Sequence, residues 1–159
     1  MRPLFRFWRN LTDWRIGVNS HKTAIARKKP SAPMMRLKAA GRLVGRMLDY
    51  GSGRGYDASH FGMDSYDPYY DPVMPFGKFD TITCIYVLNV VESVAEREAI
   101  VEDIRNRLNK GGRAYITVRN DKKALTGCKA TGSWQGLVVM DLPIVSNGSG
   151  FVTYCFCKG

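Results

Sequence analysis

The apolar residues of this chain fall into short runs separated by polar, glycine-rich or proline-rich segments, a pattern typical of an α/β protein. Runs with the length and composition of buried strands occupy residues 46–50, 63–67, 79–87 and 113–119. The run 79–87 is the most apolar and is predicted to be a central strand buried on both faces. Residues 137–141 and 151–157 are predicted to pair as a terminal hairpin around Asn147-Gly148-Ser149-Gly150.

Helix signals lie between these runs. A helix is predicted over Pro33–Gly41, opened by the proline and ended by the glycine, and only a one-turn helix fits between Gly55 and Gly62. The longest predicted helix starts at Ser93, an N-cap with Glu96 three residues on, and would end at Lys110-Gly111-Gly112. The segment 68–77 contains three prolines and is predicted to hold no regular element. This order predicts an α/β sheet with an antiparallel edge.

Composition sets the broad class. The 159 residues suggest one domain, and no apolar run approaches the roughly 18 residues that a membrane span needs. Arginines interrupt the apolar residues at the N-terminus, so no secretory signal and no membrane partner are predicted. The four cysteines form no CxxC pair, which favours reduced thiols, a cytoplasmic location and no metal site.

Positive charge is concentrated at the N-terminus. Residues 1–48 carry 12 Lys/Arg against one acid, whereas the rest of the chain is close to neutral and the net charge is +10. The basic residues are interleaved with aromatic ones, Phe5, Phe7, Trp8 and Trp14, and a short amphipathic helix is predicted over 4–16. Residues 1–33 are therefore interpreted as a basic arm and loop ahead of a domain over 34–159. The arm would either contact nucleic acid or pack its aromatics on the domain.

A glycine loop follows the first strand run. The sequence Asp49-Tyr-Gly-Ser-Gly-Arg-Gly55 has glycines at alternate positions, where the backbone can turn sharply beside a ligand. A dinucleotide fingerprint would need its third glycine at position 56, which is Tyr56, so that interpretation fails. Right-handed crossovers would bring this loop, Asp67 and Asn89 together at the carboxyl ends of the strands, where open α/β sheets bind ligands.

These motifs carry a family resemblance. The glycine loop, Tyr66-Asp67-Pro68-Tyr69-Tyr70, Phe79-Asp80 and Tyr86-Val-Leu-Asn-Val-Val-Glu92 resemble a class I, Rossmann-like S-adenosylmethionine-dependent methyltransferase. More narrowly, they resemble the small phage and bacterial methyltransferases found beside DNA-phosphorothioation systems. The resemblance implies a truncated Rossmann-like methyltransferase sheet with a C-terminal antiparallel hairpin.

The resemblance also implies roles in binding S-adenosylmethionine. The backbone at Gly51, Gly53 and Gly55 would wrap the methionine part, and Asp49 would interact with its α-ammonium. Asp67 would accept hydrogen bonds from the two ribose hydroxyls, because a carboxylate presents two acceptor oxygens side by side. Asp64, two residues earlier, is the competing candidate for this role.

Further residues complete the predicted cofactor side. Pro68 and Tyr69 follow Asp67 and would also contact the cofactor. Asn89 is the predicted catalytic residue, facing the cofactor and the methyl-transfer position, unless it merely starts the next helix.

Three departures from the wider class are visible. The first crossover helix is short, the third strand with its adenine-contacting acid is missing, and no [D/N]-P-P-[Y/F] motif follows the fourth strand. In place of the missing acid, aromatic side chains would stack on the adenine, namely Tyr69, Tyr70 and Phe76. The missing motif argues against methylation of adenine N6 or cytosine N4.

The acceptor side is less defined. Lys22 and Arg27 would contact a phosphorylated substrate or the cofactor carboxylate, unless they belong to a solvated loop. The candidate bases for deprotonating an acceptor are His21, His60, Glu92 and Asp121.

The leading hypothesis is a cytoplasmic methyltransferase acting on nucleic acid or a nucleotide-like substrate, with a homo-oligomer as a further expectation. A non-catalytic protein that binds S-adenosylmethionine or nucleic acid on a degenerate methyltransferase fold is the rival. An enzyme that cleaves the cofactor without an acceptor is a third alternative.

Overall fold

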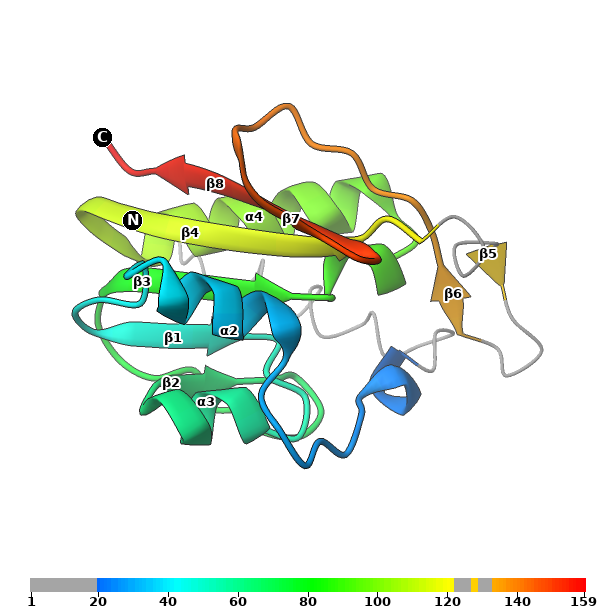
Figure 1. The fold of residues 1–159 in the computed structure, drawn as a ribbon, viewed down its shortest axis with the longest axis horizontal. Coiled ribbons are helices and arrows are strands. Elements are labelled where there is room, and N and C mark those ends of the chain that lie inside the picture. Colours follow the sequence, from blue (N-terminus) through cyan, green and yellow to red (C-terminus); the bar gives the residue numbers. More distant parts are fainter. Residues whose placement is uncertain (1–19, 122–126, 129–132) are drawn as a thin grey trace, which may run out of the picture.

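The structure, a computed structural model, describes residues 20–121, 127–128 and 133–159 (Figure 1). Its largest feature is a six-stranded sheet. The strands are β1 (Met47–Tyr50), β2 (Asp64–Tyr66), β3 (Phe79–Ile85), β4 (Leu108–Arg119), β7 (Ile144–Gly148) and β8 (Phe151–Cys157). Their order is β2-β1-β3-β4-β8-β7, with the first four parallel and β8 antiparallel to both neighbours. The predicted α/β sheet with a C-terminal antiparallel hairpin is confirmed.

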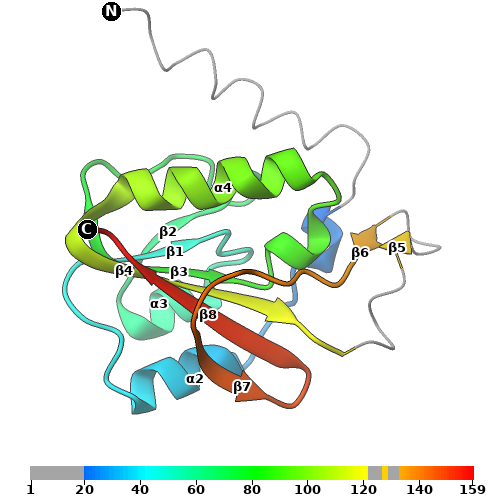
Figure 2. The ribbon, with the colours of Figure 1, turned by 90° about the horizontal axis from the view of Figure 1, so that it is seen from above.

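Helices cover both faces of this sheet. They are η2 (Ser20–Thr23), α2 (Ala32–Ala39), α3 (Tyr56–Phe61), η3 (Leu88–Val90) and α4 (Val94–Arg107). Seen from above, α4 lies on one face of the sheet and α2 and α3 lie on the other (Figure 2). Two short strands, β5 (Gly127–Cys128) and β6 (Trp134–Gln135), pair separately.

Each face has its own apolar core. Ile104 of α4 is fully buried in the cluster that includes Ile82 of β3. On the other face Met34 and Leu37 of α2 are buried in a cluster with Tyr115 of β4. Burial on both faces explains why β3 and the second half of β4 contain few charged residues.

The predicted starts of the helices are confirmed. Pro33 lies in the first turn of α2, and Gly41 follows its C-cap with a φ of 66°. The one-turn helix between Gly55 and Gly62 is α3. At the start of α4 the Ser93 hydroxyl accepts a hydrogen bond from the Glu96 N–H over 3.2 Å, which satisfies one of the unpaired amides of the first turn.

The predicted end of the longest helix is wrong. Helix α4 ends at Arg107, and Leu108 is already extended, with a ψ of 143°. Leu108 is 1% exposed and pairs with Phe79, so its burial in the sheet ends the helix before the glycines. Gly111 and Gly112 instead lie in the irregular first part of β4, where Gly111 has a φ of 78°.

The predicted partner strand of the C-terminal hairpin is also wrong. Residues 137–141 form no strand, and β7, which pairs with β8, begins at Ile144. Gly148 pairs directly with Phe151, so the connecting turn is only Ser149-Gly150. A two-residue turn requires the residues just before Gly148 to be the pairing partners, which excludes the earlier apolar run.

The described sheet ends at β2, with no strand beyond it. The link from β2 to β3 contains no helix or strand, as its three prolines predict, and has a single bridge between Asp67 and Asp71. Within the described residues, the sheet is therefore truncated at β2.

The predicted helix over 4–16 lies outside the described residues. Within the described part, no helix is long and apolar enough to cross a membrane.

Candidate active site

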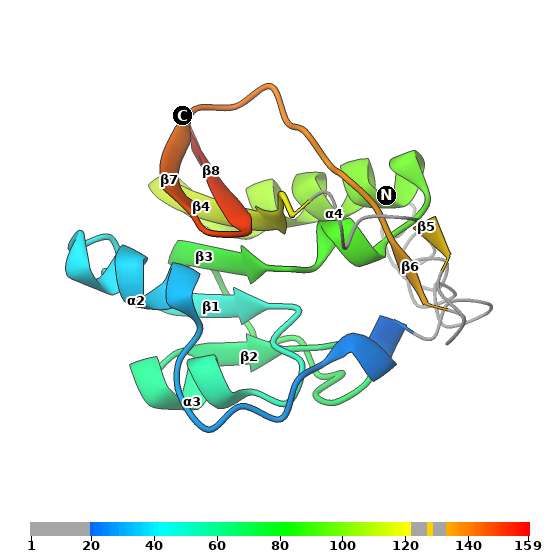
Figure 3. The same ribbon diagram turned by 45° about the vertical axis from the view of Figure 1, so that its right-hand side comes forward.

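A cavity of about 470 Å³ opens at the carboxyl ends of the parallel strands, a size typical of small-molecule sites. Figure 3 shows the arrowheads of β1, β2 and β3 pointing toward this end of the sheet, where η2 and β6 also lie. The cavity is lined by residues of the segment 21–27, the glycine loop, the end of β2, the segment 85–91 and the end of β4. The predicted convergence of the glycine loop, Asp67 and Asn89 is confirmed.

The glycine loop adopts a conformation that favours glycine. Gly51, Gly53 and Gly55 have φ values of 78°, 55° and 77°. A Cβ at Gly51 would lie 2.4 Å from a methyl carbon of Val87, so the loop also packs closely against the segment after β3. Gly51 and Gly53 line the cavity, whereas Gly55 is the N-cap residue of α3 and does not.

Asp67 fastens the glycine loop to the end of β2. One carboxylate oxygen accepts the N–H of Gly53 over 2.9 Å. The other accepts the N–H groups of Tyr69 and Tyr70 over 2.9 and 3.0 Å. The side chain is 9% exposed and lines the cavity. A carboxylate has about four acceptor positions, so Asp67 can still accept a hydrogen bond from a ligand.

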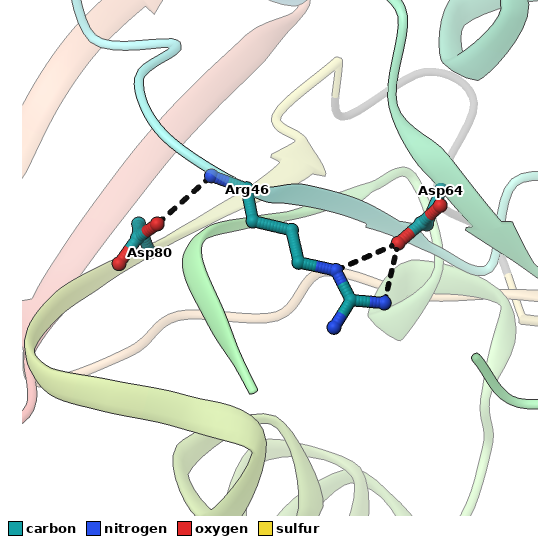
Figure 4. Close-up of polar contacts among 3 residues, drawn as sticks. All are labelled: Arg46, Asp64 and Asp80. Carbon is teal, nitrogen blue, oxygen red and sulfur yellow. Dashed lines mark hydrogen bonds and ion pairs between the residues drawn. The ribbon is translucent and has the colours of Figure 1, made fainter. Parts of the chain in front are cut away.

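Asp64, the competing acid, lies at the other end of β2. Its carboxylate accepts two hydrogen bonds from the Arg46 guanidinium, over 2.9 and 3.1 Å, and it does not line the cavity (Figure 4). The backbone N–H of Arg46 also donates a hydrogen bond to the Asp80 carboxylate over 2.8 Å. This bond, together with one from the Asn109 side chain, lowers the pKa of Asp80. These residues join the starts of β1, β2 and β3, so geometry favours Asp67 over Asp64 as a ligand-binding acid.

Asp49 is a buried carboxyl with an unusual pKa. It is 4% exposed, and Thr83 donates a hydrogen bond to it over 3.0 Å. Burial is the main cause that raises its pKa to about 7, and the Thr83 hydrogen bond acts in the opposite direction. The nearby carboxylates of Asp57 and Asp67 raise the pKa further by charge repulsion, whereas the positive charge of Arg27 lowers it. A cation bound in the cavity would relieve this repulsion and favour the ionised carboxylate.

Asn89 lies in η3, not at the start of α4. It is 1% exposed and lines the cavity, and its backbone carbonyl accepts the N–H of Gly136 over 2.9 Å. Its side-chain oxygen is buried without a hydrogen-bond partner. A buried acceptor left unpaired is unfavourable in the free protein, so this oxygen is a candidate for accepting a hydrogen bond from a ligand.

The predicted substrate residues separate in the structure. Arg27 lines the cavity, whereas Lys22 is exposed and does not. Of the candidate bases, His21 and Asp121 line the cavity, and His60 and Glu92 do not.

The predicted adenine-stacking aromatics lie outside the cavity. Pro68 lines it, but Tyr69, Tyr70 and Phe76 do not. The Tyr69 ring is stacked on His21 with ring centres 4.1 Å apart, and Phe76 is 95% exposed. The Tyr70 ring packs edge to face against Tyr69, with ring centres 4.9 Å apart, and lies under the Arg54 guanidinium.

Sequence reasoning missed several residues of the cavity, Asp57 and Tyr86 among them. Asp57 is 7% exposed and accepts the N–H of Ser31 over 2.9 Å. Its position in the first turn of the helix after the glycine loop is the sequence feature from which a role in the cavity could have been predicted. Tyr86 lines the cavity with a φ of 60°, the one positive value among the described non-glycine residues. Sequence carries no signal for that conformation.

A family model supplies the decisive comparison. A sequence model described as a methyltransferase domain matches residues 23–141, well over half of the chain. The chain belongs to the methyltransferase-domain family. The matched region contains the glycine loop, Asp67, Asn89 and Arg27. The predicted methyltransferase class is confirmed. No curated protein is significantly similar in sequence.

Solved structures share the methyltransferase fold at low sequence identity. An N1-methyltransferase for 1,6-didemethyltoxoflavin from Burkholderia thailandensis, solved with S-adenosylhomocysteine, has a TM-score of 0.59 at 14% identity, over 99% of this chain and 91% of that one. The N-methyltransferase NodS from Bradyrhizobium japonicum has a TM-score of 0.55 at 12% identity, over 89% and 98%.

A third similar structure is larger. It is a protein of echinomycin biosynthesis, associated with conversion of a disulfide bond into a thioacetal group, with a TM-score of 0.51 at 17% identity. The match covers 72% of this chain and 59% of that protein. At these identities the likeness concerns the fold, which agrees with the predicted Rossmann-like methyltransferase class.

Proposed function

We propose that the chain is an S-adenosylmethionine-dependent methyltransferase whose acceptor is a nucleic acid or a nucleotide-like molecule. The observation that carries this proposal is the pair of buried acids, Asp49 and Asp67, which flank the glycine loop in a cavity at the carboxyl ends of parallel strands. Membership of the methyltransferase-domain family supports the same reaction class.

The residues of the cavity fit the methyl donor. Asp49 is suited to the α-ammonium group, because a cation there offsets the repulsion among the buried carboxylates. Asp67 is suited to the ribose hydroxyls, and its other hydrogen bonds hold it rigidly in place. Gly51 and Gly53 allow the backbone to approach the ligand closely. Arg27 is suited to the donor's carboxylate.

When bound, S-adenosylmethionine supplies a methyl group attached to a positively charged sulfur, which is already activated toward nucleophiles. The protein therefore contributes mainly position, by holding the acceptor in line and excluding water. Asn89 would orient the acceptor through its unpaired side-chain oxygen, which can accept a hydrogen bond. His21 and Asp121 line the cavity and would receive a proton from an acceptor that must lose one.

Two features of the sequence support a nucleic-acid or nucleotide-like acceptor. The basic residues before position 49 would contact phosphates, and the aromatic residues among them would stack on bases. The narrower resemblance to methyltransferases found beside DNA-phosphorothioation systems has the same implication. Nucleic acid is accordingly the proposed partner of the N-terminal segment.

The test is binding followed by transfer. Calorimetry with S-adenosylmethionine and S-adenosylhomocysteine should give saturable binding to the folded full-length chain, and absence of binding by either would overturn the proposal. Tritiated methyl from S-adenosylmethionine should then appear in DNA, in RNA or in the nucleotide fraction of a cell extract. Label in protein or lipid alone would support methyltransferase activity but would overturn the proposed class of acceptor.

The truncated sheet favours one rival, a non-catalytic protein that binds S-adenosylmethionine or nucleic acid. The sequence predicts that the third strand, with its adenine-contacting acid, is missing, and the described sheet has no strand beyond β2. Binding without transfer to any fraction would support this rival. Product formed in buffer alone would instead indicate cleavage of the cofactor without an acceptor.

We further propose a cytoplasmic location and self-association. Among the cysteines whose side chains the structure describes, Cys84, Cys155 and Cys157 are free thiols, in line with a reducing compartment. Fractionation of cells that express the tagged chain tests the location, and light scattering of the purified chain tests the oligomeric state.

A further inference from the structure

The cavity also extends to the end of β4. Tyr86, Arg119, Asp121 and Ser149 line the cavity together with Gly150. Arg119 ends β4, which is separated from β1 by β3 and from β2 by two strands. The acids suited to the methyl donor lie in β1 (Asp49) and directly after β2 (Asp67), so the β4 side of the cavity is left for the acceptor.

Tyr86 is held in a strained backbone conformation at this end. Its φ of 60° is unfavourable for a tyrosine, and its N–H donates to the Thr117 carbonyl over 2.8 Å, which fixes the turn after β3. Strained non-glycine residues persist where the surrounding structure holds them, and they are concentrated at functional sites. The side chain is half-buried and lines the cavity.

The charges around Tyr86 point to an anion. Burial raises the pKa of its phenol; the nearby Arg27 and Arg119 oppose that effect, and the Asp57 carboxylate adds to it. Tyr86 therefore stays neutral at physiological pH and can donate a hydrogen bond. Arg119 adds a permanently charged guanidinium, which matches the geometry of a carboxylate or a phosphate.

Arg119 is available for such a contact. Its ion pair with Asp121 is long, at 3.9 Å, and both side chains are more than a third exposed. Exposed ion pairs of this kind contribute little free energy, so a bound anion can compete with Asp121 for the guanidinium. By contrast, Arg54 at the cavity stacks over Tyr70, and Arg27 lies within electrostatic range of Asp49.

We propose that Tyr86 and Arg119 bind an anionic group of the methyl acceptor, either a carboxylate or a phosphate. The assignment of this group to the acceptor rests on the proposed function, but the anion site itself does not. Both residues are positioning and specificity-determining residues, and neither is required to take part in breaking or forming a bond.

The site is tested first without any methyl donor. Inorganic phosphate and acetate are titrated separately into the full-length chain at constant ionic strength, and the melting temperature is followed. One of the two anions should raise it, and Arg119→Gln should abolish the rise. Arg113→Gln is the matched control, because it removes the same charge from the middle of β4, outside the cavity. An equal response of Arg119→Gln and wild type, or no response to either anion, overturns the proposal.

The second test links the site to the acceptor. With tritiated S-adenosylmethionine and a dilution series of cell extract, Arg119→Gln should raise the half-saturating amount of extract at least about tenfold, since a charged hydrogen bond is lost. Tyr86→Phe should raise it less, and Arg113→Gln should leave it unchanged. Affinity for S-adenosylhomocysteine should be the same in all four proteins.

The two tests separate the two proposals. If wild type fails to bind S-adenosylhomocysteine, the proposed function is wrong, while the anion titration still reports on the site. If wild type transfers methyl groups and Arg119→Gln does so with unchanged half-saturation, the acceptor site has been assigned wrongly. The responding anion identifies the group, phosphate being the result that agrees with a nucleotide-like acceptor.

Discussion

The carboxylate of Asp67 accepts the backbone N–H of Gly53 over 2.9 Å and thereby joins the end of β2 to the glycine loop. Its second oxygen accepts two further backbone N–H groups, from Tyr69 and Tyr70. The acid proposed to bind the cofactor ribose is therefore also the residue that shapes the loop on which the cofactor would lie. Binding and local structure cannot be separated at this position by removing the side chain alone.

Asp67→Asn is expected to lose most of the affinity for S-adenosylhomocysteine. The amide keeps the size of the side chain but replaces one acceptor oxygen by a donor, which would face a backbone N–H. The unpaired groups should also lower the free energy of unfolding by about 1–3 kcal/mol. Calorimetry measures the first effect and urea denaturation the second, which shows whether the protein is folded under the binding conditions.

Asp64→Asn is the matched control, on the same strand but outside the cavity. Its partner is Arg46, in an ion pair whose side chains are 46% and 41% exposed, so the change should cost less than about 1 kcal/mol. Affinity for S-adenosylhomocysteine should not change. A loss of affinity in Asp64→Asn similar to that in Asp67→Asn would show that the wrong acid was chosen.

Affinity for S-adenosylhomocysteine should depend on pH through Asp49. Its pKa, raised to about 7 by burial, means that the carboxyl is largely protonated in the free protein below pH 7. The ligand's ammonium needs the carboxylate, so binding should weaken as pH falls from 8 to 6 and should release a proton near pH 6. Calorimetry in buffers of different ionisation enthalpy measures that proton. Asp49→Asn should bind weakly at every pH and release none.

The same pKa predicts a stability effect of opposite sign. Because the folded state holds the proton of Asp49 more tightly than the unfolded state, this group's contribution to stability falls as pH rises from about 4 to about 7. Asp49→Asn, which can still accept the Thr83 hydrogen bond, should therefore be more stable than wild type at pH 8, by a few kcal/mol at most. Urea denaturation at pH 5 and pH 8 tests this, and equal stability of the two proteins at both values would contradict it.

Gly51→Ala should lower the free energy of unfolding by more than the positive φ of this position alone would cause. The substitution combines a φ of 78° with an overlap against Val87, at 2.4 Å, and should cost about 2–4 kcal/mol. Gly41→Ala separates the two effects, because its φ is 66° but nothing lies within 4 Å of the added carbon. It should cost about 1–2 kcal/mol. In the Val87→Ala background the difference between the two alanine variants should shrink, as urea denaturation of all four proteins would show.

Local patterns were sufficient to predict the parallel part of the fold. The apolar run 79–87 and the glycine loop each depend on neighbours in sequence, so β3 and the turn after β1 were predictable. The end of α4 was not, because burial of Leu108 against Phe79 is a contact between distant segments. The strand that pairs with β8 was mispredicted for a related reason: a two-residue turn decided between two apolar runs.

The candidate site was predictable on its cofactor side and not on its acceptor side. Asp49 lies near the end of β1 and Asp67 directly follows β2, so their position at one edge of the sheet follows from the order of elements. Tyr86 has no sequence signal for its positive φ, and Arg119 becomes a cavity residue only through the register of β4 on β3. The Tyr69 ring was expected to face the cofactor, but stacking on His21 occupies it instead.

Deleting residues 1–16 should weaken binding to nucleic acid and reduce its dependence on salt. This segment carries Arg2, Arg6, Arg9 and Arg15, and each arginine that neutralises a phosphate releases counterions. The slope of log K against log salt should fall by up to about 4 for duplex DNA. Replacing the four arginines by glutamine should reproduce the change in slope while keeping the aromatic residues. If the deletion weakens binding but the glutamine variant does not, the aromatic side chains and not the charges carry the contact.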